Sequence, residues 1–215
     1  MIDRDKMVLE RCAGKKVLHV GCCAAPACRE MCESGRLLHL KLREVASELW
    51  GLDMSGEDIT YLKDQYQMEN LVVGDAELID RSFPSSSAFD VIVAGDVIEH
   101  LKNPGLFLDG THSLLAPQGI LIVSVPNGVV FHRGLKSLLG KETVNLDHNF
   151  YFSRKTLCHL LSSCGYETNE IYGFRLRDWS ITALFDLFAS MFSQWACEGV
   201  VAIARPSPAR GSEKE

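Results

Sequence analysis

The sequence predicts an α/β fold, in which strands and crossover helices alternate to form one doubly wound, mostly parallel sheet. Two observations lead to this prediction. Short runs rich in β-branched residues alternate with segments of helical period along the 215 residues. The run Val91–Ala94 is apolar throughout, which indicates a strand buried on both faces near the centre of a parallel sheet.

The first half of the chain begins with an expected strand at Lys16–Val20. Apolar residues at helical spacing across Leu38–Leu49 predict a helix, which leads into a short strand at Trp50–Asp53. A helix is expected over Ser55–Gln67, with its first residue as the cap and two acidic residues in its first turn. The next strand is Leu71–Val73.

The second half continues the same alternation. Asn103–Leu115 reads as a helix with asparagine as cap and proline at its first helical position. A strand follows at Ile120–Val125. A serine-capped helix is expected over Ser153–Gly165, where the glycine supplies a left-handed end. The last strand candidates are Thr168–Tyr172 and Val200–Ala204.

Composition limits the class of protein. An apolar content of 47% over this length suits a single domain, expected at residues 1–205, followed by a disordered tail at 206–215. The net charge is −6 and no basic run occurs, which argues against a nucleic-acid partner. The charged N-terminus and the lack of a long apolar run predict a cytoplasmic protein. The eight cysteines are therefore expected as reduced thiols.

Four residues follow expected strands and mark the candidate site: Gly21, Asp53, Asp75 and Asp96. In an open α/β sheet, ligands bind beyond the carboxyl ends of the strands. Glycine permits close approach of a ligand to the backbone. A carboxylate offers two acceptor oxygens to a ribose diol or one to an exocyclic amine. Together these residues predict a nucleoside pocket rather than a metal site.

Five segments, in order and spacing, resemble the successive motifs of class I S-adenosylmethionine-dependent methyltransferases: Lys16–Cys22, Gly51–Met54, Val73–Glu77, Phe89–Leu101 and Leu115–Leu121. The resemblance extends from about Lys15 to Arg205, and Phe89–Leu101 is its most specific element. It implies a Rossmann-like seven-stranded sheet whose strand seven is antiparallel. It also implies S-adenosyl-L-methionine as cofactor and S-adenosyl-L-homocysteine as product.

The resemblance further implies which residues surround the cofactor. The methionine part would lie near Gly21 and Cys22, the ribose near Asp53 and Met54, the adenine near Asp75 and Ala76, and the reactive end near Gly95 and Asp96. The sequence departs from the family in its first loop, where His19, Cys23 and Ala25 replace the usual acid and glycines. A family branch linked to sugar and cell-envelope biosynthesis is similar in having histidine there, followed by a Gly-Cys pair.

Methyl transfer to a hydroxyl acceptor needs a base, and two histidines are candidates. His100 follows the fourth strand, and His148 lies in a polar and aromatic loop before the Ser153 helix. Histidine suits this role because its ordinary pKa lies near neutrality. A purely structural role for either histidine is the alternative. The expected acceptor is a small molecule, a sugar or a lipid-linked compound, and the sequence identifies neither the acceptor nor its reacting atom.

Other functions remain open. The cysteines Cys22, Cys23, Cys28 and Cys32 could bind a metal or an iron–sulfur cluster, although no C-x-x-C pair is present. A dehydrogenase would need a G-x-G-x-x-G loop, which is absent. A cofactor-binding protein without catalysis is a further alternative. An aromatic-rich helix at Trp179–Trp195 predicts a packing or homodimer contact, and its alternatives are a lid over a hydrophobic acceptor or a membrane-surface helix.

Overall fold

The computed structural model describes residues 2–84, 87–130, 140, 144–175 and 197–207. The helix expected at Trp179–Trp195 and residues 208–215 of the expected tail lie outside the described residues.

A seven-stranded sheet in the order β3-β2-β1-β4-β5-β7-β6 forms the centre of the fold. β7 runs antiparallel to both of its neighbours, and β1 to β5 are mutually parallel, so the doubly wound sheet with an antiparallel seventh strand is confirmed. β4 lies between β1 and β5, as its apolar run predicts. The strands are β1 Lys16–Val20, β2 Glu48–Asp53, β3 Leu71–Val73, β4 Phe89–Gly95, β5 Leu115–Pro126, β6 Tyr166–Phe174 and β7 Gly199–Pro206.

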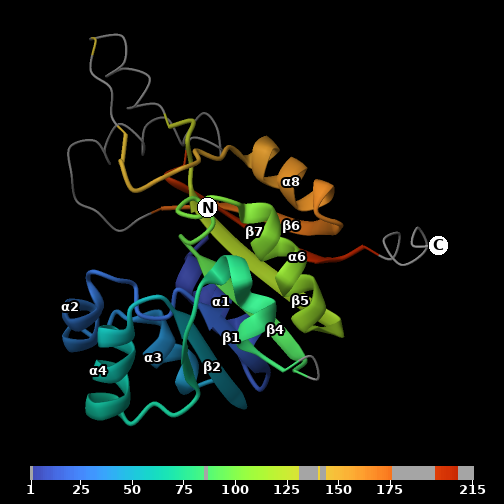
Figure 1. Ribbon diagram of the computed structural model, residues 1–215. Coiled ribbons are helices and arrows are strands. Elements are labelled where there is room, and N and C mark those ends of the chain that lie inside the picture. Colours follow the sequence, from blue (N-terminus) through green and yellow to red (C-terminus); the bar gives the residue numbers. More distant parts are fainter. Residues whose placement is uncertain (1, 85–86, 131–139, 141–143, 176–196, 208–215) are drawn as a thin grey trace.

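Helices flank the sheet in the described part of the chain. In Figure 1, α2, α3 and α4 lie on the side of the dark-blue β1 and the teal β2, and α8 lies beside β6 and β7 toward the opposite edge of the sheet. The N-terminal end lies near the middle, between these two halves. The helices are α1 Arg4–Cys12, α2 Cys28–Glu33, α3 Leu38–Arg43, α4 Gly56–Tyr66, the 3₁₀ turn η1 Ala76–Leu78, α5 Ile79–Ser82, α6 Pro104–Leu114 and α8 Arg154–Ser163.

The strands alternate their side chains between two apolar cores. Leu18 and Val20 of β1 pack with residues of α6 and α8 on one face of the sheet. Val17 of the same strand packs with Val8 of α1 and Leu42 of α3 on the other face. Successive side chains of a strand point to opposite faces, so a buried parallel strand contributes to both cores.

Two of the expected helix caps form as predicted. The Ser55 side chain accepts a hydrogen bond from the Asp58 backbone N–H, and Ser153 and Thr156 form a capping box at α8. The Asn103 side chain does not cap α6. The carboxylate of Glu77 instead accepts hydrogen bonds from the backbone N–H groups of Lys102 at 2.6 Å and Asn103 at 3.1 Å. A residue distant in sequence therefore satisfies the backbone before this helix.

The helix expected over Leu38–Leu49 is shorter than predicted. α3 ends at Arg43, and Leu49 belongs to β2, which begins at Glu48. Pairing of β2 with β1 starts at Lys16 and Glu48, and this parallel ladder requires an extended chain there. Sheet pairing therefore overrides the helical spacing of the last apolar positions.

No helix among the described residues combines the length and apolar character needed to cross a membrane.

Candidate active site

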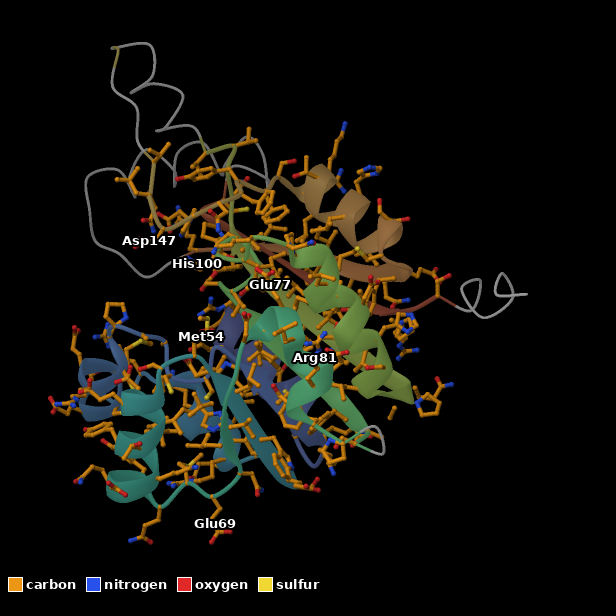
Figure 2. All side chains as sticks on the ribbon, in the orientation of Figure 1. Met54, Glu69, Glu77, Arg81, His100 and Asp147 are labelled. Atoms are coloured by element: carbon orange, nitrogen blue, oxygen red, sulfur yellow. The ribbon has the colours of Figure 1, made fainter. Side chains whose placement is uncertain are left out.

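A cavity of about 520 Å³ opens beyond the carboxyl ends of β1, β2 and β4. Residues at the ends of these strands line it, namely Gly21 after β1, Asp53 of β2 and Gly95 of β4. Its volume lies within the range of small-molecule sites, and its position agrees with the rule for open α/β sheets. The cavity therefore lies at the edge of the sheet where the sequence predicts the site. Figure 2 shows Met54 and His100, which both line this cavity, toward one end of the sheet and Glu69 at the opposite end.

Asp53 is the buried carboxylate of the cavity. Its side chain accepts hydrogen bonds from the backbone N–H groups of Cys23 at 2.8 Å and Ser55 at 3.0 Å. The residue is only 9% exposed. Each oxygen therefore has one fixed partner and can accept a further hydrogen bond, because a carboxylate oxygen has two lone pairs.

Gly21 and Cys22 follow β1, but they face different surroundings. Gly21 lines the cavity with a φ of 72°, and both residues donate their backbone N–H groups to the Leu52 carbonyl oxygen. The Cys22 side chain is fully buried in an apolar cluster with Leu37 and Ile59, and it is not among the residues that line the cavity. The Cys22 side chain is therefore turned away from a ligand in the cavity.

The loop after β3 contributes its small residues, rather than its acid, to the cavity wall. Gly74 and Ala76 line the cavity, whereas Asp75 is exposed and does not. The Asp75 carboxylate accepts a hydrogen bond from the Glu77 backbone N–H at 2.9 Å and thereby caps the 3₁₀ turn. Met54 lines the cavity mouth and is 71% exposed.

Asp96 is held by residues from α1 and β5. Arg4 of α1 donates a hydrogen bond to the Asp96 carboxylate at 2.6 Å, and Ser124 of β5 accepts one from the Asp96 backbone N–H at 2.8 Å. Asp96 adopts a φ of 55°, which is uncommon for a residue other than glycine. Such backbone conformations concentrate at functional sites. All three residues line the cavity next to Gly95.

The two histidines expected as catalytic candidates lie side by side. The ring centroids of His100 and His148 are 4.6 Å apart, in an edge-to-face arrangement. His100 Nδ1 lies 2.9 Å from the Asp147 carbonyl oxygen, and Figure 2 shows His100 and Asp147 as neighbours. Asn149 donates its backbone N–H to the Glu99 carbonyl oxygen and its side-chain amide to the His100 carbonyl oxygen. These bonds hold the His148 loop against the residues that follow β4.

Glu99 adds a buried acid to the histidine pair. It is 1% exposed, and neither of its side-chain oxygens has a hydrogen-bond partner among the described residues. Burial raises the pKa of Glu99 to about 8, and the nearby Asp96 charge acts in the same direction. Ligand atoms of Glu99, His100 and His148 lie within 4.8 Å of one another, as do those of Cys22, Cys23 and Asp53. Both groups have donor types that could bind a metal ion.

The cysteines of the first loop form part of an apolar cluster. Cys22, Cys23, Cys28 and Cys32 are buried together with Leu37, Ile59 and Leu62. All eight cysteines of the chain are free thiols. Burial raises the pKa of the Cys28 thiol, which disfavours the thiolate that a metal or an oxidant would meet.

Sequence reasoning missed the part of the cavity wall that α1 contributes. Arg4 and Val8 line the cavity, and no helix was expected before β1. A local signal existed, since Asp3 accepts a hydrogen bond from the Lys6 backbone N–H as an N-cap. His19 was noted only as a departure from the family loop, yet it also lines the cavity.

Sequence comparison identifies relatives of this chain. A family model described as "Methyltransferase domain" matches residues 4–171. A probable S-adenosylmethionine-dependent methyltransferase of Mycolicibacterium smegmatis is 29% identical over 76% of this chain and 56% of its own length. A ubiquinone biosynthesis O-methyltransferase of Rhodopseudomonas palustris is 24% identical over 58% of this chain and 45% of its own. These matches cover about half the length of the two curated relatives.

Solved structures share the fold at low sequence identity. An S-adenosylmethionine-dependent methyltransferase from Archaeoglobus fulgidus superposes with a TM-score of 0.62 at 17% identity, covering 94% of this chain and 90% of its own. The N-methyltransferase NodS from Bradyrhizobium japonicum, solved with S-adenosyl-L-homocysteine, gives a TM-score of 0.57 at 15% identity, covering 94% and 85%. At these identities the likeness concerns the fold.

Proposed function

This chain belongs to the methyltransferase-domain family, and on that premise we propose that it transfers the methyl group of S-adenosylmethionine to a small-molecule, sugar or lipid-linked acceptor. The observation that carries the proposal is Asp53. A buried carboxylate, fixed by two backbone N–H groups on the wall of a cavity of about 520 Å³, is suited to accept hydrogen bonds from a ribose diol.

The residues present fit an adenosyl cofactor. Asp53 would hold the ribose, with Met54 covering it at the mouth. Ala76 and the backbone after β3 would border the adenine, and the exposed Asp75 side chain would reach it only by leaving its cap position. Gly21 offers bare backbone to the methionine part, and Cys22 would lie next to it in the chain with its side chain turned away.

The bound cofactor supplies a methyl group that is already activated as a sulfonium. The protein's own part is therefore to align an acceptor nucleophile and, for a hydroxyl acceptor, to remove its proton. Gly95 and Asp96 line the cavity beside β4, and His100 at the cavity edge is in ring contact with His148. We assign the base to this histidine pair. The buried Glu99 lies within reach of both rings and would be protonated near neutral pH.

The free thiols bear on the cellular location of the protein. Eight free cysteines suit a reducing compartment, which supports a cytoplasmic location. By name, the ubiquinone biosynthesis O-methyltransferases among the relatives transfer a methyl group to oxygen, which is compatible with a hydroxyl-bearing acceptor for this chain.

Calorimetric titration with S-adenosylmethionine, S-adenosylhomocysteine and NAD tests the function. We expect binding of both adenosyl ligands with dissociation constants of roughly micromolar order, and no binding of NAD. Failure of both adenosyl ligands to bind would overturn the proposal, and binding of NAD alone would favour a dehydrogenase. Cofactor binding without methyl transfer across a panel of phenol, catechol, sugar and amine acceptors would favour a non-catalytic binding protein.

A further inference from the structure

A buried histidine pair connects the cavity wall to α3. Nδ1 of His19 in β1 and Nδ1 of His39 in α3 are 3.2 Å apart, and the two rings are stacked with centroids 5.3 Å apart. The side chains are almost inaccessible, with 4% of His19 and none of His39 exposed. The two residues are 20 positions apart in sequence. Neither has a role in the methyl transfer proposed above.

Both rings are neutral. Burial lowers the pKa of His19 to about 3, with a further contribution from the positive charge of Arg4. Burial also lowers the pKa of His39 well below its ordinary value. A neutral imidazole carries one N–H and one bare nitrogen, so one of the two Nδ1 atoms donates and the other accepts.

The surroundings of His39 decide the direction of this hydrogen bond. His39 Nε2 is buried and has no hydrogen-bond partner among the described residues. A buried N–H without a partner is rarer in proteins than a buried acceptor without one. This preference assigns the bare nitrogen of His39 to Nε2, so that its Nδ1–H donates to His19 Nδ1. His19 must then carry its own proton on Nε2.

His19 is itself part of the cavity wall. His19 lines the cavity and its Nδ1 is occupied by His39, so Nε2 is the ring nitrogen left for a ligand in the cavity. Arg4, whose charge acts on His19, lines the same cavity and forms an ion pair with Asp96. This part of the wall thus presents a neutral N–H donor near a guanidinium group. Because the Arg4 guanidinium is already paired with Asp5 and Asp96, the His19 N–H is the donor that this part of the wall can offer to a ligand carboxylate.

We propose that His19 donates a hydrogen bond from Nε2–H to the carboxylate of the amino-acid end of the cofactor, and that His39 is a positioning residue that fixes the His19 tautomer. The inference rests on the proposed function, since it assigns one end of the adenosyl ligand. It assigns a role to His19, which replaces the acid that is usual at this position in the family.

Two ligands that differ only at the amino-acid end test the contact. S-adenosylhomocysteine carries the carboxylate, whereas 5′-methylthioadenosine lacks the whole amino-acid group. For His19→Leu we expect the affinity for S-adenosylhomocysteine to fall about tenfold or more, and the affinity for 5′-methylthioadenosine to stay within about twofold. His159→Leu, which changes an exposed histidine of α8, is the matched control and should alter neither affinity.

The outcomes separate this inference from the function. If the unaltered protein binds neither ligand, the proposed function fails. If it binds both, and His19→Leu weakens both equally or neither, the carboxylate contact is wrong while the function stands.

The tautomers can be measured in the unaltered protein, so that the test does not depend on a variant that folds. Long-range proton–nitrogen correlation spectra should show the His19 proton on Nε2 and the His39 proton on Nδ1. The opposite pair of tautomers would overturn the positioning role. His39→Leu should lower the affinity for S-adenosylhomocysteine selectively, and His39→Gln, which keeps an N–H donor, should restore part of it. Equal affinities in these two variants would contradict a role for the donor.

Discussion

The carboxylate of Asp53, at the end of β2, accepts a hydrogen bond from the Cys23 backbone N–H at 2.8 Å. This bond joins the cysteine loop after β1 to the strand that carries the expected ribose acceptor. The loop and the acceptor therefore form one unit, and a change at Asp53 affects both.

We expect Asp53→Ala to weaken binding of S-adenosylhomocysteine about 10-fold to 100-fold, because hydrogen bonds to a charged acceptor contribute roughly 1.5–3 kcal/mol. Asp75→Ala is the matched control, since this carboxylate is exposed and caps a 3₁₀ turn. It should change the affinity much less. Calorimetry measures both variants, and equal losses in the two would contradict the ribose assignment.

Gly21→Ala should destabilise the fold. Gly21 has a φ of 72°, and a Cβ added there would lie 2.7 Å from Val97 Cγ2. Gly14 has a nearly equal φ of 69°, but a Cβ there would meet nothing within 4 Å. Gly14→Ala should therefore cost only the left-handed backbone conformation, about 1–2 kcal/mol, and Gly21→Ala should cost more. Urea unfolding compares the two variants, and equal free energies of unfolding would show that the Val97 contact yields without cost.

Glu99 should make stability fall as the pH rises. Its pKa is raised to about 8 in the folded state, above the value of 4.5 for a solvent-exposed glutamate of the unfolded chain. The folded state thus keeps a proton that the unfolded state releases. The stabilisation is complete below about pH 4.5 and is lost as the pH rises through 8. Urea unfolding of the protein and of Glu99→Gln should give a difference that changes across this window, and a constant difference would argue against a buried acid.

The His19–His39 pair should have the opposite dependence. Both pKa values are lowered by burial, that of His19 to about 3, whereas unfolded histidines titrate near 6.5. Between pH 6.5 and 3 the unfolded state therefore binds protons at these histidines, whereas the folded state does not. The free energy of unfolding falls as the pH drops through this range. The double variant His19→Leu/His39→Leu should lose less stability over this range than the unaltered protein. Parallel unfolding curves at every pH would contradict the buried neutral pair.

The histidine pair at the cavity edge should matter for hydroxyl acceptors. Replacing a general base typically costs about 10²-fold to 10⁴-fold in rate. We expect His100→Ala or His148→Ala to reduce release of S-adenosylhomocysteine by such a factor while cofactor affinity is kept. His159→Ala serves as the control with an exposed histidine. Full activity in both variants would exclude this base.

Much of the fold could be predicted from the sequence, because its signals are local. β1 and β3 occupy the predicted ranges, and Ser55 and Ser153 cap the predicted helices. The predicted end of the helix at Leu49 was wrong, since Leu49 fits a helical period but belongs to β2, and α3 ends at Arg43. Short apolar segments satisfy either period, and only the neighbouring strand decides between them.

The candidate site divides in the same way. The strand ends predicted Gly21, Asp53 and Asp96 at the cavity, because parallel strands bring their carboxyl ends to one edge. The side-chain directions of Cys22 and Asp75 did not follow from their positions. One packs into the cysteine cluster and the other caps a turn.

The sequence alone predicted the alternation of strands and helices and the edge of the sheet where the strand-end acids lie. This was possible because the hydrophobic period of each segment depends on neighbouring residues. The tertiary structure alone decided that Arg4 meets Asp96, 92 positions away, and that His19 meets His39. The packing of helices on the sheet brings these partners together. Burial then determines their charge and proton positions, which cannot be predicted from neighbouring residues in the sequence.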